Sequence, residues 1–448
     1  MRLIRYIYYK LRHVRRFLLS IIHFLLHVIV VCWVLIQAKL IGKKRDFSQM
    51  PRLLWGPVPI LNNKYWNNAM KEMGYESTTL MTHHYGANKK GDFDNYLGSF
   101  ANPNRLVSKY FSSLVVYFDF IKAIKEYDII HIPCSGFILN TQNTWLKNYE
   151  IRILKWSKVK IVVIPFGGDY YRYSRIRSPL LINVFLKSYP LAAREEKSIQ
   201  EDVDRWVEVA DVFLPSIALD GIGRWDLVVP NTLTIDTQKW CLTKKVSEND
   251  GKNGAVKIIH TPNHRGFKGT DFIIKACEEL KEEGLQLELI LVEGRTNEEV
   301  AELMQNEADI LAEQLIFNGY ALSGLEGMSS GLPVLANLDD KEYTELFYLF
   351  SFLNECPILS TTPYTVKDNL RLLITNPELR KELGMAGRKY VQKYHSNKTA
   401  QFIFENIYQK IWFNKEVDLM ELFEPLKPNS YNNRTEKIKH PLVKGKLV

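Results

Sequence analysis

The sequence predicts an α/β protein of two domains, each built on a parallel sheet, with a membrane-associating helical segment at its start. Three observations predict this organisation. The chain has 448 residues, enough for two domains with full hydrophobic cores. Several short segments are continuously apolar, as strands are in a parallel sheet that helices cover on both faces. The first 45 residues differ from the rest, because they are basic and apolar and contain no acidic residue.

Residues 1–46 form the predicted membrane-associating segment. Residues 1–45 contain ten Lys or Arg, so the formal charge of +9 leaves about −1 for the remainder of the chain. A basic excess confined to one terminus favours a membrane surface over a nucleic-acid groove as the partner. Residues 17–36 carry no formal charge and are long enough to cross a bilayer. Before them, apolar residues recur at helical steps, at Ile4, Ile7, Leu11, Val14 and Leu18. A spanning helix and an interfacial helix both fit this pattern.

Residues 47–235 are predicted to form the first domain. Apolar runs predict strands at Leu53–Trp55, Tyr127–Pro133, Lys160–Pro165 and Ala210–Pro215. The third of these runs ends in a glycine-rich loop that contains Gly168 and Asp169. Open α/β sheets place their ligands at such carboxyl strand ends.

A polar stretch between about residues 233 and 254 is the predicted linker to a second domain, residues 250–395. This domain opens with the strand Val256–His260. The loop that follows, residues 260–269, contains Arg265 and Lys268. A charged helix, another helix over residues 396–413 and a basic tail over 414–448 complete the chain.

The stretch from Ala308 to Asn337 predicts a strand, a glycine-bearing loop, a helix and a second strand. Ser323 is a candidate cap for a helix that starts near Gly324, and Glu326 would then lie on its first turn. A helix that opens after such a loop offers free N–H groups and a positive dipole end to an anion. A diphosphate flanked by a ribose suits this geometry. A strand–loop–helix unit that binds nothing is the alternative.

This stretch resembles the donor-binding element of retaining glycosyltransferases of the GT-B type, family 4. Glu326 matches the second Glu of their Glu-x7-Glu motif, and Gly331–Val334 match the Gly-Leu-Pro-Val run. Asn318 stands where the family has the first Glu, and Phe166 stands where its His-Gly-Ser-Asp loop has histidine. The resemblance implies two Rossmann-like domains with the donor in the interdomain cleft, and a last helix, residues 396–413, that crosses back onto the first domain.

The resemblance also implies roles for the site residues. Arg265 and Lys268 would face the diphosphate, Glu326 would hold the ribose hydroxyls, and Asn318 would contact the donor sugar. Asp169 would contact a sugar hydroxyl, act as a base or simply cap its loop. The remaining expected site residues line the two loops and are Gly168, Gly319, Tyr320, Ser323 and Gly324. No Asp-x-Asp motif ends a predicted strand, and the five cysteines have no paired spacing, so we expect no metal and no cofactor besides the donor.

The sequence therefore predicts a glycosyltransferase of hexosyltransferase type at the cytoplasmic face of a membrane, independent of metal. It would transfer a sugar from a nucleoside diphosphate to a glycan or lipid-linked acceptor, with retention, in the synthesis of a cell-surface polysaccharide. No nucleic-acid partner is expected. Two alternatives stay open. One is a catalytically degenerate subunit that binds glycan or a partner protein, and the other is a sugar-nucleotide epimerase or phosphorylase on the same fold.

Overall fold

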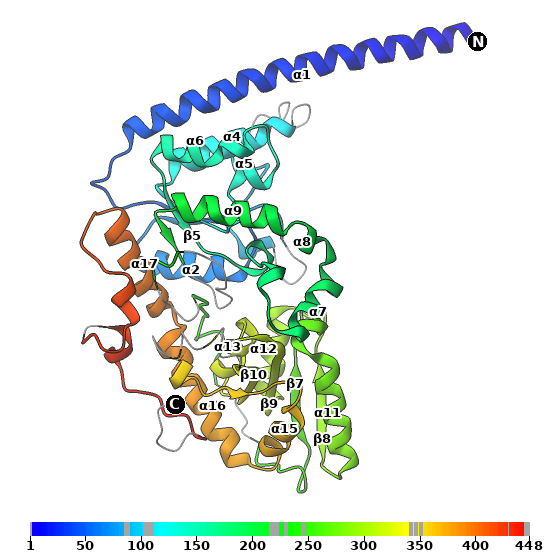
Figure 1. The fold of residues 1–448 in the computed structure, drawn as a ribbon, viewed down its shortest axis with the longest axis vertical. Helices are drawn as coiled ribbons and strands as arrows, with labels where there is room; N and C mark the ends of the chain where they lie inside the picture. Colours follow the sequence, from blue (N-terminus) through cyan, green and yellow to red (C-terminus); the bar gives the residue numbers. More distant parts are fainter. Residues whose placement is uncertain are drawn as a thin grey trace.

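The computed structural model describes residues 2–84, 90–101, 112–214, 224–227, 232–242, 247–339, 344, 348, 353–428 and 430–442. These residues form two α/β domains, one after the other along the long axis of the molecule, with a long N-terminal helix lying across the end of the first domain (Figure 1). The predicted fold class, two parallel-sheet domains preceded by an apolar helix, is confirmed.

The N-terminal domain has a six-stranded sheet in the order β3-β2-β1-β4-β5-β6, in which all pairs are parallel. Its strands are short, and those at the centre are buried along their whole length, which explains their continuously apolar sequences. They are β1 (Leu53–Trp55), β2 (Ser77–Met81), β3 (Asn95–Tyr96), β4 (Ile129–Ile132), β5 (Lys160–Val163) and β6 (Val212–Phe213). The helices of this domain are α2 (Leu61–Glu72), α4 (Ser112–Glu126), α5 (Ile138–Thr141), α6 (Glu150–Ser157), α7 (Pro179–Ser188), α8 (Pro190–Arg194) and α9 (Glu196–Val209).

The C-terminal domain has a five-stranded parallel sheet in the order β11-β10-β9-β7-β8. Its strands are β7 (Val256–His260), β8 (Leu287–Leu291), β9 (Ile310–Asn318), β10 (Val334–Asn337) and β11 (Leu359–Ser360). The central strand β9 is the longest, and its neighbours on both sides bury it almost completely. The helices are α10 (Arg265–Lys268), α11 (Thr270–Glu282), α12 (Asn297–Asn306), α13 (Leu322–Ser329), α15 (Val366–Ile374) and α16 (Pro377–Tyr394).

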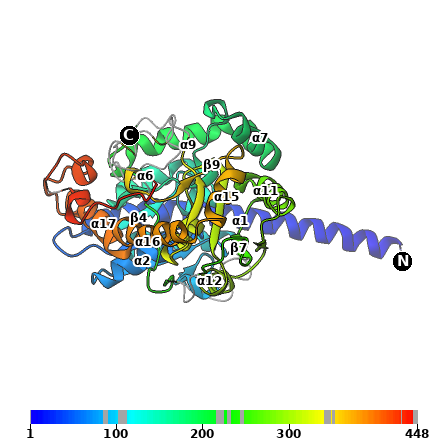
Figure 2. The same ribbon diagram turned by 90° about the horizontal axis from the view of Figure 1, so that it is seen from below.

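The last helix, α17 (Asn397–Ile411), leaves the C-terminal domain and packs against α2 of the N-terminal domain (Figure 2). Its Tyr408 hydroxyl lies 2.9 Å from His131 Nε2 in the core of the first sheet. His131 Nδ1 lies 3.1 Å from the carbonyl oxygen of Leu54, which can only accept, so Nδ1 carries the proton and Nε2 accepts from Tyr408. Burial lowers the pKa of His131 to about 3, which keeps the ring neutral in this role. The contact fixes the end of the chain to the first domain.

The N-terminal helix α1 (Arg2–Lys44) packs against α4 and α6 along its C-terminal half, while its first turns extend past the body of the protein (Figures 1 and 2). Val34 and Ala38 are fully buried in the core that these helices share. Gly42 allows the closest approach, because a Cβ atom there would lie 2.0 Å from the carbonyl oxygen of Trp156. Within α1, Ser20–Lys44 is long and apolar enough to cross a membrane by length and composition.

Arg45, the residue after α1, is bound into the N-terminal domain by an ion pair and backbone contacts. Its guanidinium pairs with the Asp128 carboxylate, and both side chains are more than nine-tenths buried. It also donates to the carbonyl oxygens of Ser157 and Tyr127, each at 2.9 Å. The packing of the first domain therefore begins inside the predicted membrane-associating segment, well before residue 47.

We expect Arg45→Ala to lower the free energy of unfolding by about 1.5–3 kcal/mol, because it removes one of the two ion-pair partners of the Asp128 carboxylate while Arg52 remains. Lys43→Ala is the matched control, since Lys43 is an exposed basic residue only two positions earlier. Urea unfolding of the full chain in detergent measures both variants. Equal, small losses in the two would show that Arg45 does not fix α1 to the domain.

Candidate functional site

Lys268 is the centre of a buried polar cluster at the carboxyl end of the second sheet. It lies at the end of α10, a single turn that follows β7, and its side chain is 6% exposed. Its ammonium group pairs with the Glu313 carboxylate and lies 3.1 Å from Gln314 Oε1 and 3.2 Å from Ser323 Oγ. The cluster therefore joins α10, β9 and α13 through one cation.

Glu313 and Gln314 reach the same ammonium group because β9 is irregular at this point. Against β10, Ala312 pairs with Leu335 and Gln314 pairs with Ala336, so Glu313 is an extra residue without a counterpart. Such a bulge interrupts the alternation of side chains along a strand. Two consecutive polar residues therefore contact Lys268, inside a strand that is otherwise apolar.

Glu313 has unequal surroundings at its two carboxylate oxygens. Oε1 pairs with Lys268 and accepts a hydrogen bond of 2.7 Å from the Ser323 hydroxyl. Oε2 is buried and has no hydrogen-bond partner in the described part of the chain. The side chain is 0% exposed, so its charge is balanced within the protein by Lys268.

The helix that carries Ser323 and Glu326 starts earlier than its sequence predicts. α13 begins at Leu322 after Ala321, so the prediction of a start near Gly324 with Ser323 as its cap is wrong. Ser323 lies in the first turn, where its hydroxyl donates to Glu313 instead. Gly324 faces β9, and a Cβ there would lie 3.1 Å from Tyr320 Cβ and 3.6 Å from Glu313 Cγ. A larger residue would push α13 away from the cluster.

Glu326 lies on the second turn of α13 rather than the first, and it is buried. Its carboxylate accepts a hydrogen bond of 3.1 Å from Asn297 Nδ2, at the start of α12. Asn297 Oδ1 in turn accepts a hydrogen bond of 2.6 Å from Lys239. Burial raises the pKa of Glu326 to about 7, and the Asn297 hydrogen bond and the charges of Lys239 and Lys268 oppose this rise. Glu326 therefore changes its charge near neutral pH.

The turn after β9 is held by backbone contacts. Gly319 has a φ of +82°, which favours glycine, and its N–H donates to the Asn337 carbonyl oxygen at 2.7 Å. Its own carbonyl oxygen accepts from Gln314 Nε2 at 2.9 Å. Asn318, the last residue of β9, is buried next to this turn. Asn318 thus lies at the carboxyl end of the central strand, where the resemblance places the donor sugar.

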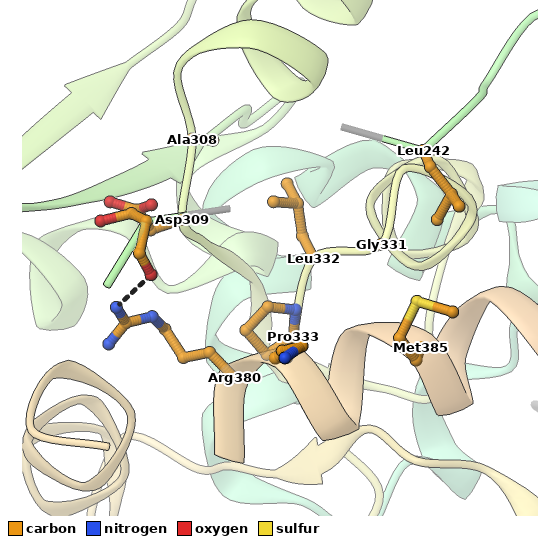
Figure 3. A pocket seen from close by; sticks show the side chains of 10 residues that line it. Leu242, Ala308, Asp309, Gly331, Leu332, Pro333, Arg380 and Met385 are labelled. Atoms are coloured by element: carbon orange, nitrogen blue, oxygen red, sulfur yellow. Dashed lines mark hydrogen bonds between the residues drawn. The ribbon is translucent and has the colours of Figure 1, made fainter. Parts of the chain in front are cut away.

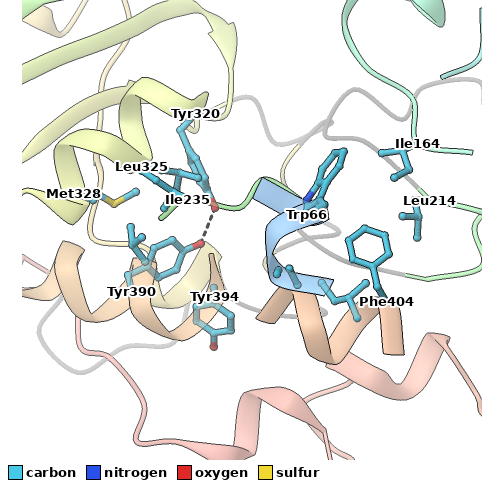
Figure 4. Packing of buried hydrophobic residues seen from close by; sticks show 14 of the residues in the cluster. Trp66, Ile164, Leu214, Ile235, Tyr320, Leu325, Met328, Tyr390, Tyr394 and Phe404 are labelled. Atoms are coloured by element: carbon cyan, nitrogen blue, oxygen red, sulfur yellow. Dashed lines mark hydrogen bonds between the residues drawn. The ribbon is translucent and has the colours of Figure 1, made fainter. Parts of the chain in front are cut away.

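Tyr320 is part of the core between the domains, where its hydroxyl points toward Tyr390 (Figure 4). Its hydroxyl lies 2.9 Å from both the Tyr390 hydroxyl and His395 Nε2. His395 Nδ1 is 2.8 Å from the carbonyl oxygen of Leu233 in the interdomain linker, so this nitrogen carries the proton. Burial lowers the pKa of His395 to about 4, which leaves Nε2 free of a proton to accept. Tyr320 therefore connects the turn after β9 to the domain junction.

Asp169 and Gly168 lie in the loop after β5 of the first domain. The two Asp169 oxygens accept from the N–H groups of Phe166, at 3.0 Å, and Cys134, at 2.7 Å. These contacts join the loops after β4 and β5, as the capping alternative describes. Burial raises the pKa of Asp169 to about 7, against the effect of the backbone N–H groups. Gly168 is exposed, and a Cβ there would meet no atom within 4 Å.

Arg265 and Lys268 contact different residues, although both belong to α10. Its side chain is 47% exposed and pairs with Glu293, at 3.0 Å, and with Asp271, at 3.6 Å. Four residues of this region were not predicted from the sequence, namely Glu313, Gln314, Asn297 and Lys239. The available signal was the Glu313-Gln314 pair, the only polar side chains between Ile310 and Phe317.

The first domain covers α10 with an apolar contact that the sequence did not reveal. Phe185 on α7 stacks edge-on against Phe267, with ring centroids 4.7 Å apart, and Phe267 also contacts Phe317 on β9. A Cβ at Gly266 would lie 2.9 Å from Val184 Cγ1, so the two domains are in close contact here. This contact fixes the position of α10, and therefore of Lys268, relative to the first domain.

A pocket of about 100 Å³ lies at the opposite edge of the second sheet (Figure 3). Asp309, which precedes β9, and Pro333, which precedes β10, line it together with Leu332, Arg380 and Met385. Ligands of open α/β sheets bind at the carboxyl ends of strands, and this pocket lies at the amino ends. The Lys268 cluster is therefore the candidate site. Within the described residues, no group of three or more His, Cys, Asp or Glu side chains is placed to hold a metal.

No protein-family model and no curated protein sequence matches the chain. Among solved structures, a TarM mutant from S. aureus, in complex with fondaparinux, alpha-GlcNAc-glycerol and UDP, has a TM-score of 0.51 at 11% identity, covering 80% of this chain and 100% of that chain. A glycosyltransferase from Rickettsia africae has a TM-score of 0.45 at 13% identity, covering 82% and 100%. S. aureus MnaA with UDP has a TM-score of 0.43 at 14% identity, covering 81% and 97%.

The likeness to TarM supports one statement about the chain, namely its fold. The two sheets and the returning α17 are arranged as in a GT-B glycosyltransferase, so the predicted architecture is confirmed. The roles of the individual site residues stay predictions.

We expect Glu313→Gln to tighten the binding of UDP or GDP about tenfold, because it removes a negative charge beside the cation that would face the diphosphate. The same change should lower the melting temperature of the ligand-free protein, since Lys268 loses its ionic partner. Gln314→Glu is the matched control and should weaken nucleotide binding. Calorimetric titration and thermal melts measure both effects. If the nucleotide affinity is unchanged in both variants, the cluster lies outside the nucleotide site.

The pKa of Glu326, about 7, predicts a pH dependence of nucleotide affinity. Below this pH the carboxyl group is neutral, and above it the carboxylate accepts ribose hydroxyls more strongly. The affinity for UDP or GDP should therefore rise as the pH increases from about one pH unit below 7 to about one pH unit above 7. In Glu326→Gln this contribution should vanish, and because the ionisation of the nucleotide is common to both proteins, the difference isolates Glu326. Identical pH profiles would contradict its placement at the ribose.

Proposed function

We propose that the chain is a membrane-associated glycosyltransferase that transfers a sugar from a nucleoside-diphosphate sugar to a glycan or lipid-linked acceptor. The observation that carries this proposal is the buried Lys268 cluster beside Glu326, at the carboxyl end of the central strand of a GT-B second domain. Transfer would proceed with retention and without a metal, as the resemblance to family 4 implies. Its product would be a cell-surface polysaccharide, made at the cytoplasmic face of the membrane.

The leaving diphosphate is the group that the cluster would stabilise. Negative charge grows on the diphosphate as the glycosidic bond breaks, and a positioned cation lowers the barrier by meeting that charge. Gln314 and Ser323 also contact the Lys268 ammonium group and keep it at the carboxyl end of the sheet. The N-terminal turn of α13 lies beside it and contributes the positive end of its dipole.

Glu313 limits how much charge the cluster can offer. While its carboxylate pairs with Lys268, the two charges cancel, so Lys268 would have to move from Glu313 to a phosphate oxygen during binding. Arg265 can supply a second cation, because it is exposed and, among the described residues, pairs with the exposed carboxylates of Glu293 and Asp271. Binding of the donor would then exchange these surface pairs for contacts with the diphosphate.

Glu326 and Asn318 would hold the two ends of the donor. Glu326 would accept ribose hydroxyls, with Asn297 orienting its carboxylate. Asn318 would hydrogen-bond the sugar but, as an amide, supplies no negative charge at the reacting carbon. The catalytic contribution therefore falls mainly on the leaving-group side, on Lys268 and Arg265.

A second candidate function is that of a degenerate subunit that binds a glycan or a partner protein. Two observations favour it, namely Asn318 in place of the first Glu of the motif and the neutralisation of Lys268 by Glu313. Such a subunit would bind neither UDP nor GDP and would turn over no donor.

The test measures release of UDP or GDP from a panel of nucleotide sugars, with and without membrane glycolipid, in buffer that contains EDTA. We expect turnover in EDTA, a loss of about 100-fold or more in Lys268→Ala, and a loss worth about 1–2 kcal/mol in Asn318→Ala. Glu326→Ala should lose more than Asn318→Ala, because a charged acceptor is removed.

Three results would contradict the proposal in different ways. Activity that disappears in EDTA and returns with Mg²⁺ or Mn²⁺ would refute metal independence. Equal and negligible losses in Asn318→Ala and Glu326→Ala would refute the placement of the donor. Absence of both nucleotide binding and turnover in the wild type would favour the degenerate subunit.

A further inference from the structure

The outer face of α1 is a continuous apolar stripe on the surface of the protein. Its members recur at three- and four-residue steps and are exposed, from Phe17 (66%) through Ile29 (62%) to Ile36 (57%). The stripe, as we use the term, consists of Phe17, Ile21, Phe24, Leu25, Val28, Ile29, Cys32 and Ile36. In the sequence, the apolar residues that recur at helical spacing from Ile4 to Leu18 continue at the same spacing to Ile21. A soluble protein rarely exposes so long an apolar surface.

The inner face of the same helix is packed against the first domain over most of this length. His23 Nε2 lies 2.9 Å from Ser113 Oγ, the ring centroids of Trp33 and Phe118 are 5.3 Å apart, and Arg45 pairs with Asp128 just beyond the end of the helix. From His23 to Arg45 this is about 33 Å of helix at 1.5 Å per residue. If this part of α1 crossed a bilayer, α4 and α6 would have to enter the hydrocarbon with it.

Those two helices cannot enter the hydrocarbon at an acceptable free-energy cost. α4 carries Lys122, Lys125 and Glu126, and α6 carries Arg152 and Lys155. A charged side chain at the centre of a bilayer costs several kcal/mol. The packing of α1 therefore excludes the spanning orientation that its length and composition allow.

The surroundings of the stripe match a bilayer interface that contains anionic lipid. Residues 1–45 contain ten Lys or Arg and no acidic residue, and Lys39, Lys43 and Lys44 end the stripe as exposed cations. Beside the stripe, Trp145 contacts Phe24, with ring centroids 5.6 Å apart, and is half exposed. Tryptophan at the edge of an apolar surface is typical of the headgroup layer.

A cavity of about 660 Å³ adjoins the C-terminal end of α1. Leu40 and Ile41 form its apolar wall, and Lys44 and Lys125 bring positive charge to its other side. Glu76 also lines the cavity, so its charge is mixed. The cavity therefore brings apolar and basic side chains together at the end of α1.

We infer that α1 lies in the plane of an anionic membrane surface, with its stripe immersed and its lysines among the headgroups, so that the protein is monotopic. This inference deepens the membrane association of the proposed function. It depends on the packing of α1 and not on glycosyl transfer.

Depth measurement distinguishes an in-plane helix from a spanning one. Three labelled proteins are compared, and all of them carry Cys241→Ser. In the first, the fluorophore is attached to the native Cys32. In the other two, Cys32→Ser is combined with Ile21→Cys or Ile36→Cys, and the fluorophore is attached to the new cysteine. The labelled full chain is bound to vesicles of phosphatidylcholine and phosphatidylglycerol in a two-to-one ratio, and lipid-borne quenchers report the depth. The in-plane orientation gives equal, shallow depths at all three positions. A spanning helix separates Ile21 and Ile36 by about 22 Å across the bilayer and would overturn the inference.

Binding of the full chain to vesicles tests the stripe and its lysines separately. Ile29→Glu should abolish binding, whereas Phe272→Glu, an exposed apolar position on α11, should not. Lys43→Gln with Lys44→Gln should weaken binding to the mixed vesicles about tenfold to thirtyfold. Lys275→Gln with Lys381→Gln, two exposed lysines of the second domain, should leave it unchanged.

Several outcomes would overturn the inference. They are equal binding to pure phosphatidylcholine and to the mixed vesicles, no binding to either, and a stable dimer that hides the stripe and does not bind vesicles. Titration of the same Ile29→Glu variant with UDP and GDP separates this inference from the proposed function. If the wild type binds vesicles as expected but no nucleotide, the glycosyltransferase proposal fails and the membrane orientation stands.

Discussion

The candidate site depends on the buried ion pair between Lys268 and Glu313. A lysine that is 6% exposed needs a partner, and the bulge in β9 supplies both Glu313 and Gln314 to it. The pair fixes α10 against β9, while Ser323 ties α13 to the same carboxylate. Three elements that are separate in the sequence therefore converge on one charge. A ligand that takes Lys268 from Glu313 would therefore alter the contacts of all three elements.

The sequence predicted the fold well where strands are buried and short. β1 and β7 begin and end at the predicted residues, and the β9–α13–β10 unit lies where the apolar runs and glycines placed it. The start of α13 was predicted wrongly, because Ser323 suits a cap but Glu313 offers its hydroxyl a charged acceptor. Glu313 itself was missed because a bulge depends on the register between two strands, which the composition of one strand does not reveal.

Contacts between distant segments were also beyond the sequence. Phe185 and Phe267 come from different domains and pack edge-to-face. This contact cannot be predicted until the relative position of the two domains is known. Tyr320 was expected at the donor pocket, and its hydrogen bonds to Tyr390 and His395 instead place its hydroxyl at the domain junction. In the same way, the apolar run of α1 fits a spanning helix until Arg45 and Asp128 show that its inner face belongs to the first domain. Local periodicity records which face of a helix is apolar, and packing determines what that face contacts.

The orientation of α1 restricts how an acceptor could reach the site. Figure 1 shows α1 at one end of the molecule and the C-terminal domain, which carries Lys268 and Glu326, at the other. With the stripe of α1 in the membrane, the first domain would lie between the bilayer and the Lys268 cluster. A sugar attached directly to a lipid headgroup would stay near α1, a full domain away from the cluster. If the chain transfers sugar as proposed, the in-plane orientation would favour an acceptor whose growing end lies on an extended glycan, long enough to pass along the first domain to the interdomain cleft.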